Sequence, residues 1–170
     1  MHVATESVDP TVATAKDLFA RVFVPVDYTT SSHLAVGAAL ELQRAFGSKV
    51  CIFQLAEEGG DDEFLGGLGA PRTPGELVEI ARGRLHRFID NIAPEFSGSV
   101  EVRARVIVKP MEDIREEAHR WGASLVVVAT TFAGLFRSPA EKLVHRFDLP
   151  VLLIPAIGEG GSVEVAETTH

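Results

Sequence analysis

Residues 129–142, ATTFAGLFRSPAEK, combine several features that could bind an anion. They follow an apolar run and lead into a helix start, where Ser138 can serve as the N-cap and Glu141 can close a capping box. Helix N-termini attract phosphate through their free N–H groups, and Arg137 could add a cationic contact. Phosphate loops are usually rich in glycine, however, and Gly134 is the only glycine in this stretch. The stretch has the position of a phosphate loop without its usual composition.

No other arrangement of side chains is typical of a catalytic or metal site. Ser31 and Ser32 lack the Gly-x-Ser-x-Gly context of a nucleophile elbow. The acidic runs at 59–63 and 111–113 are typical of solvated surface, with a hard-cation site as the weaker alternative. Four histidines lie on four different predicted helices, without the i, i+4 spacing of a helical zinc site: His33, His86, His119 and His145. We therefore predict a protein that is not an enzyme and binds no metal.

The composition describes one ordinary globular domain. The chain has 170 residues, with 16 Lys and Arg against 24 Asp and Glu, and a formal net charge of −8. This balance argues against broad nucleic-acid binding, which requires clustered cations. The single cysteine, Cys51, lies in an apolar run and is expected to be a buried, inert thiol. The polar start of the chain lacks a signal-peptide pattern, and no apolar run is long enough to span a bilayer, so we expect a cytoplasmic protein without membrane contact.

Apolar runs and helical patterns alternate along the chain and predict an α/β fold. Strands are expected at 17–27, 48–56, 99–110, 123–130 and 150–156. Helices are expected after the possible N-cap hydroxyls of YTTSS (28–32) with a stop at Gly47, from Thr73 or Pro74 to Pro94, at 111–122 and at 138–147. Helical connections favour parallel strands, so we expect an open five-stranded parallel sheet with helices on both faces. In the first helix the stripe Leu34, Ala38, Leu42 and Ala45 has helical spacing and is expected to face inward.

The termini are expected to lie outside this α/β domain. We divide the chain into a flexible N-terminal segment (1–16), the domain (17–156) and a polar, glycine-rich tail (157–170). Within the tail, SVEVA at 162–166 could pair with an edge of the sheet.

Ligands of open α/β sheets bind beyond the carboxyl ends of the strands, where the strand order reverses. That rule selects the end of the first strand (25–30), Leu55 at the end of the second, and the loop 129–138. Asp27 lies at the first of these places. Its carboxylate could contact a ligand, or it could form an Asx turn or helix cap before the following hydroxyl residues. The sequence alone leaves both readings open.

Three motifs in order resemble the universal stress proteins, over about Arg21 to Pro155. They are VFVPVDYTTSSHLAVGAAL, EEAHRWGASLVVVAT and SPAEKLVHRFDLPVLLIP. The resemblance implies an adenine-nucleotide-hydrolase-like fold with strand order 3-2-1-4-5. It also implies a homodimer formed through the last strand, near Val151 to Pro155.

Members of that family that bind ATP carry Gly-x-x-Gly and a later Gly-Ser or Gly-Thr after the fourth strand. On this pattern Ser138 matches the final serine, whereas Ala129, Phe132 and Arg137 replace the three glycines, and the loop is shorter. Pro139 also has no N–H to offer a phosphate. The resemblance therefore implies that ATP is not bound in the family's usual way.

The other half of the pocket keeps more of the family pattern. Asp27 matches the aspartate that approaches base and ribose, and Leu55 falls near the apolar residue that packs on the base. A nucleoside or monophosphate thus stays open as a ligand. The residues of this vestigial nucleotide pocket are Pro25, Asp27, Leu55, Ala129, Arg137 and Ser138.

The favoured function is a dimeric, non-enzymatic regulatory or interaction protein of the universal stress type, without a cofactor and with unknown protein partners. The alternative is an adenine-nucleotide-binding family member that takes ATP or AMP through an altered loop, including a slow ATPase. A small α/β enzyme of the wider adenine-nucleotide-hydrolase-like group is the third and least supported interpretation.

Overall fold

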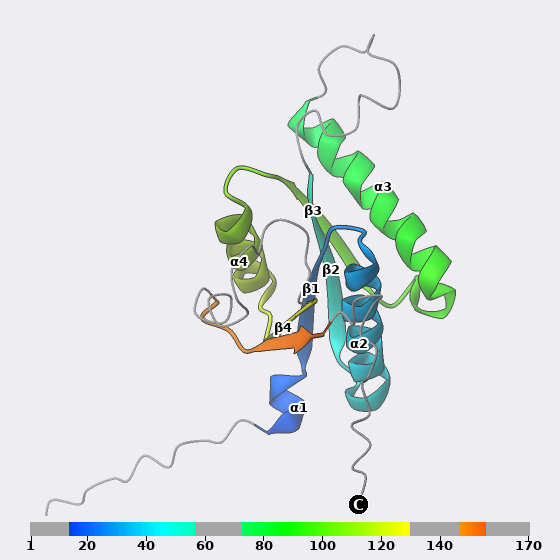
Figure 1. Ribbon diagram of the computed structural model, residues 1–170, viewed down its shortest axis with the longest axis vertical. Coiled ribbons are helices and arrows are strands. Elements are labelled where there is room, and N and C mark those ends of the chain that lie inside the picture. Colours follow the sequence, from blue (N-terminus) through cyan, green and yellow to red (C-terminus); the bar gives the residue numbers. More distant parts are fainter. Residues whose placement is uncertain (1–13, 57–72, 130–146, 156–170) are drawn as a thin grey trace, which may run out of the picture.

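A computed structural model describes residues 14–56, 73–129 and 147–155 (Figure 1). Five parallel strands form one sheet in the order β3-β2-β1-β4-β5, which confirms the expected order. The strands are β1 (Arg21–Val26), β2 (Lys49–Ala56), β3 (Glu101–Val106), β4 (Leu125–Ala129) and β5 (Val151–Ile154). The strand order reverses between β1 and β4: from β1 the chain adds β2 and β3 toward one edge of the sheet, and β4 and β5 then extend it toward the other edge.

Local capping signals mark several of the helix ends. The helices are α1 (Ala15–Leu18), α2 (Thr30–Phe46), α3 (Pro74–Ile92), the 3-10 helix η2 (Pro94–Phe96) and α4 (Pro110–Trp121). At the start of α3, Thr73 and Glu76 form a reciprocal capping box. Gly47 and Gly122 end α2 and α4 with φ angles of 70° and 78°, in the left-handed region that glycine adopts without strain. The helix expected at 138–147 lies outside the described residues, apart from Phe147.

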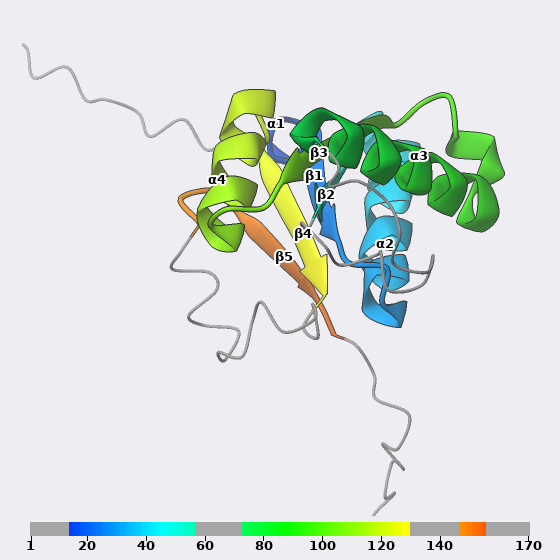
Figure 2. The same cartoon turned by 90° about the horizontal axis from the view of Figure 1, so that it is seen from above.

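Helices cover both faces of the sheet, as expected. Figure 2 shows α2 and α3 on one side of the strands and α4 on the other. Alternate residues of each strand divide between the two faces, because successive side chains of a strand point in opposite directions. In β1, for example, Val22, Val24 and Val26 join the core beneath α2 and α3, whereas Phe23 joins the core beneath α4.

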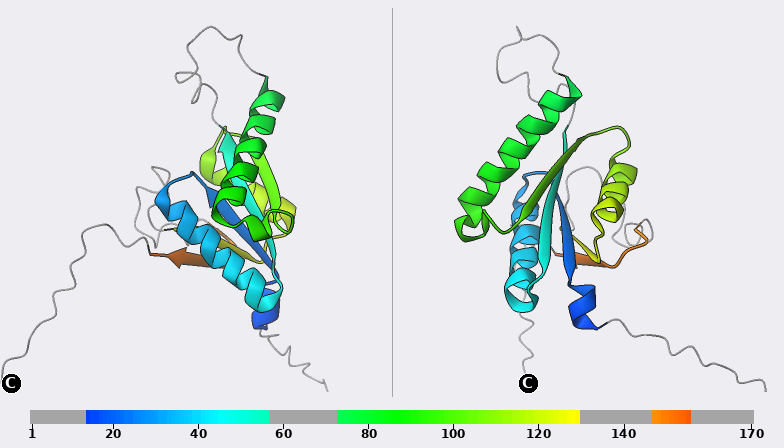
Figure 3. Two further views of the ribbon diagram at one scale, coloured as in Figure 1. Left: turned by 90° about the vertical axis from the view of Figure 1, so that its right-hand side faces the viewer. Right: turned by 180° about the vertical axis from the view of Figure 1, so that it is seen from behind.

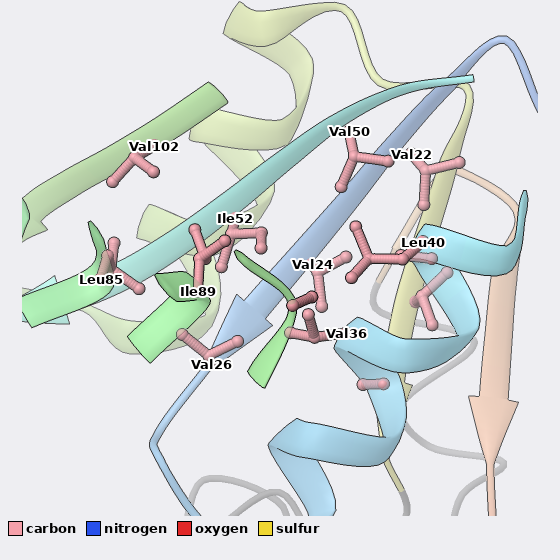
Figure 4. Packing of buried hydrophobic residues seen from close by; sticks show 14 of the residues in the cluster. Val22, Val24, Val26, Val36, Leu40, Val50, Ile52, Leu85, Ile89 and Val102 are labelled. Atoms are coloured by element: carbon pink, nitrogen blue, oxygen red, sulfur yellow. The ribbon is translucent and has the colours of Figure 1, made fainter. Parts of the chain in front are cut away.

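The core beneath α2 and α3 is built from branched aliphatic side chains (Figure 4). Val36 and Leu40 of α2 and Leu85 and Ile89 of α3 pack there against the valine face of β1 and its neighbours. The core beneath α4 is more aromatic, with Phe23 against Phe53 and Trp121. Each fully buried side chain of this size contributes about 1.5–3 kcal/mol. Because both faces are covered, residues 22–26 of β1 are all apolar and buried, and only Arg21 at its start is partly exposed.

Two expectations about local structure were wrong. The first strand begins at Arg21 rather than at residue 17, because residues 15–18 form the single-turn helix α1. Thr14 and Asp17 form a capping box there, and this pair of local hydrogen bonds outweighs the apolar appearance of the run.

The second error concerns the inward face of α2. Its buried apolar residues are Ala35, Val36, Ala39 and Leu40, whereas Leu34 is 44% exposed and Ala38 and Leu42 are half-buried. The helix carries two adjacent apolar stripes, and periodicity alone does not rank them. The stripe of Ala35, Val36, Ala39 and Leu40 faces the sheet. The stripe through Ala38 and Leu42 contacts only the margin of the same core.

A chain of alternating charges connects the edge strand β3 to α4. Arg103 donates to Glu101 on its own strand, at 2.7 Å, and to Glu117 on α4, at 2.6 Å. The indole N–H of Trp121 donates to Glu101 at 2.7 Å, and the Arg21 guanidinium lies 4.1 Å from the centroid of the Trp121 ring. Glu117 is buried, so both its oxygens need donors, and Arg103 and Arg120 supply them.

Asp113 anchors the beginning of α4. Its buried carboxylate accepts hydrogen bonds from the backbone N–H groups of Val108 and Lys109, at 2.8 and 2.7 Å, and lies 3.4 Å from Arg105. Burial opposes ionisation, but the two backbone hydrogen bonds and the Arg105 charge together hold the pKa of Asp113 below its ordinary value. The loop between β3 and α4 is therefore held by a charged side chain that reaches back along the chain.

We expect Asp113→Asn to lower the free energy of unfolding at pH 7 by about 1–3 kcal/mol, because a buried charged acceptor of two N–H groups is lost. Since the folded-state pKa lies below the unfolded value of about 3.9, the stabilisation is complete at neutral pH and disappears as the pH falls through that range. Urea unfolding of both proteins from pH 7 to pH 3 should show their difference shrinking.

The matched control is Glu112→Gln, the exposed neighbour that pairs only with Lys109 among the described residues. It should cost no more than about 0.5 kcal/mol at any pH. Equal losses for Asp113→Asn and Glu112→Gln would contradict the anchoring role.

Candidate functional site

The carboxyl ends of β1, β2 and β4 bring the described pocket residues to one edge of the sheet. Pro25 is buried in β1 opposite Phe53, and Leu55 is half-buried in β2 opposite Arg105. Both face the α4 side, since Leu55 packs on the aromatic core and Pro25 alternates with the valines of the opposite face. Ala129 ends β4 opposite Ile154 and is buried on the α2 side. Arg137 and Ser138 lie outside the described residues.

Asp27 forms the Asx turn that was one of its two expected roles. Its Oδ1 accepts hydrogen bonds from the Thr29 N–H at 3.1 Å, the Thr29 hydroxyl at 2.6 Å and the Ser32 hydroxyl at 2.5 Å. Ser32 is buried, and its Oγ accepts in turn from the Asp27 N–H at 3.0 Å. This reciprocal pair connects the end of β1 to the first turn of α2. The carboxylate thus has a structural task that is complete without a ligand.

Tyr28 is the residue of this edge that the sequence did not single out. Its φ of 60° lies in the left-handed region, which a bulky residue rarely adopts. The side chain is held on the α2 and α3 side: its hydroxyl donates to Gln54 Oε1 at 2.5 Å, and its ring packs edge-on against Phe88, with centroids 5.3 Å apart. A tyrosine directly after an aspartate gives no sequence signal for a left-handed residue, so this feature could not be predicted.

His33 completes the aromatic group above this edge. Its ring packs against Phe88, with centroids 4.8 Å apart, and its Nδ1 lies 3.1 Å from the Thr29 carbonyl oxygen. Tyr28, His33 and Phe88 thus join the start of α2 to α3. The ring of Phe88 thus packs against both Tyr28 and His33.

The described residues offer no recognisable catalytic group. Burial raises the pKa of the Cys51 thiol, as expected for an inert thiol in the core. His119 lies 2.7 Å from Asp148, at the surface and away from the carboxyl edge of β1. Within the described ranges, no group of three or more His, Cys, Asp and Glu residues could hold a metal ion. Among the helices described, none is long and apolar enough to cross a membrane.

Solved structures of universal stress proteins share this architecture. A protein of the universal stress protein family from Burkholderia pseudomallei is 25% identical, with a TM-score of 0.55 over 82% of this chain and 98% of its own. The universal stress protein UspA from Lactobacillus plantarum is 14% identical, with a TM-score of 0.56 over 80% and 97%. A universal stress protein in complex with cAMP is 21% identical, with a TM-score of 0.53 over 79% and 95%.

The two relatives below 25% identity show the shared fold alone. Among curated proteins, no significant match was found. The model of the universal stress protein family matches residues 19–155, which include every described strand of the sheet. On this match, together with the strand order β3-β2-β1-β4-β5, the chain belongs to the universal stress protein family.

Proposed function

We propose that this protein is a dimeric, non-catalytic member of the family that acts through protein contacts and does not bind ATP in the usual triphosphate mode. The observation that carries the proposal is the engagement of Asp27. Its Oδ1 already accepts three hydrogen bonds from Thr29 and Ser32, in a turn that needs no ligand. A ligand that used this oxygen would have to compete with them.

The fourth strand supports the same conclusion. Ala129 stands where nucleotide-binding relatives carry the first glycine of their loop, and its side chain is buried in the core beneath α2. Glycine at such a position lets the backbone approach a phosphate closely, whereas the methyl group of Ala129 serves the packing of the core. The sequence adds two further replacements of loop glycines, Phe132 and Arg137. It also adds Pro139, which has no N–H to donate to a phosphate.

A nucleotide-binding function is the second candidate, and one observation favours it. A fold relative was solved in complex with cAMP, a ligand with one phosphate rather than three. Pro25 and Leu55 lie on the α4 face of the carboxyl edge, where an apolar base could pack. Under this proposal Arg137 would supply the anion contact that the glycines do not, for AMP, cAMP or a slowly hydrolysed ATP.

Nucleotide analysis tests the first proposal against the second. Purified protein is denatured, and the supernatant is examined for AMP, ADP and ATP by chromatography. Calorimetric titrations with ATP, AMP and cAMP follow. We expect no bound nucleotide and no heat of ATP binding, since neither the glycines nor the loop length of a triphosphate site are present.

Stoichiometric nucleotide or a micromolar dissociation constant for ATP would contradict the proposal. Binding of AMP or cAMP alone would support the second candidate. In that case Arg137→Ala should weaken binding at least tenfold, whereas Arg82→Ala, on the exposed face of α3, should leave it unchanged.

A structural role for Asp27 predicts a loss of stability that does not depend on any ligand. Asp27→Ala and Ser32→Ala should each lower the free energy of unfolding by about 0.5–2 kcal/mol, because the turn that joins β1 to α2 loses its side-chain hydrogen bonds. Thr30→Ala, at an exposed position of the same turn, should change stability by less than about 0.5 kcal/mol. Denaturant unfolding measures all three. An Asp27→Ala protein of unchanged stability would show that the carboxylate serves something other than the turn.

The proposed dimer uses the outer edge of β5. Val126 N–H donates to the Pro150 carbonyl at 2.9 Å, and Val126 lies opposite Val151. Since backbone groups alternate sides along a strand, the N–H and C=O groups of Val151 and Leu153 point away from β4. In the part of the chain that the structure describes, β5 pairs with β4 only, so these groups are placed to pair with a second copy.

Light scattering at tens of micromolar should therefore give the mass of a dimer. Leu153→Pro removes one outward N–H and should shift the protein to monomer, whereas Leu153→Ala removes the same packing but keeps the N–H and should stay dimeric. Circular dichroism confirms that both variants are folded. A monomeric parent protein would contradict the dimer, and equal effects of the two variants would exclude pairing through this backbone.

A further inference from the structure

In the sequence, β5 is followed by residues 162–166, a segment outside the described residues that could occupy the outer edge of this strand. The side chains of Val151, Leu152, Leu153 and Ile154 are all half-buried, so both faces of this strand keep exposed apolar surface. Leu152 and Ile154 belong to the margin of the core beneath α2, and Val151 and Leu153 to the margin of the other core. A strand added outside β5 would cover surface on at least one of these faces.

On the α2 side, the apolar margin extends beyond the sheet. Ala38 and Leu42 are half-buried against the same core as Leu152 and Ile154, and α2 contacts β5. The left view of Figure 3 shows β5 beside α2 at this edge of the molecule. A strand placed outside β5 would therefore meet an apolar surface formed by both elements. An exposed edge of this kind pairs with another strand unless something covers it.

The chain that follows β5 has the pattern of such a strand. Residues 162–166, Ser-Val-Glu-Val-Ala, alternate so that Val163 and Val165 share one face and Glu164 lies on the other. The intervening residues 155–161 include Gly158, Gly160 and Gly161, which give the backbone the freedom to reverse direction. The connection 155–161 follows directly from the end of β5 and is too short for the crossover that a parallel neighbour needs, so an antiparallel neighbour is favoured.

We propose that residues 162–166 pair antiparallel with the outer edge of β5 and compete there with the second copy of the chain. The inference rests on the proposed dimer, because the tail and the partner's β5 need the same N–H and C=O groups of Val151 and Leu153. A short flexible tether gives its own segment an effective concentration of about millimolar. At micromolar concentrations of the protein, the tail therefore weakens dimerisation without abolishing it. When residues 162–166 leave the edge of β5, the dimer is favoured.

The test uses the full chain and the variants Glu164→Pro and Glu167→Pro. Proline within the segment disrupts strand pairing, whereas the same change at residue 167 lies just outside it. Amide exchange of Val151 and Leu153 is measured by NMR at a concentration where each protein is monomeric. Sedimentation equilibrium then gives the dimer dissociation constant of each.

We expect Glu164→Pro to accelerate exchange at Val151 and Leu153 at least tenfold and to tighten the dimer about tenfold, with Glu167→Pro like the parent. Exchange that is the same in all three proteins would overturn the inference, and so would a dimer constant that Glu164→Pro leaves unchanged. A failure of all three proteins to dimerise at any concentration would overturn the dimer and the competition with it. In that case exchange at Val151 and Leu153 still shows whether the tail covers β5.

Discussion

The burial of β1 on both faces is the constraint on which the rest of the structure depends. Val22, Phe23 and Val24 are fully buried, and the strand pairs with β2 on one side and β4 on the other. A strand in this position needs helices above and below it, and right-handed crossovers place α2 and α3 on one face and α4 on the other. The reversal of strand order between β1 and β4 follows from the same arrangement, and with it the position of the carboxyl edge.

That edge is held in shape by polar side chains that serve the fold. Asp27 and Ser32 join β1 to α2, and Asp113 performs a comparable task between β3 and α4. Each carboxylate is satisfied by nearby N–H or O–H groups, which is the condition for burying it without a large penalty. Asp27 and Asp113 thus each have a role in the fold that involves no nucleotide.

Much of the architecture could be predicted because its signals are local. The capping box at Thr73 and Glu76 and the glycines that end α2 and α4 involve residues a few positions apart, so the chain carries them wherever it folds. Asp27 was only half predictable. Its turn is local, but the sequence alone did not decide between the turn and a ligand contact.

The sequence by itself determined the class of fold, the family and the order of the five strands. Tertiary structure alone decided which stripe of α2 faces the sheet, that Tyr28 adopts a left-handed conformation against Phe88 and Gln54, and that Arg103 bridges Glu101 and Glu117. The physical reason is the separation along the chain of the residues that interact. Periodicity and caps arise within one element, whereas burial, aromatic contacts and charge networks depend on which distant element lies opposite.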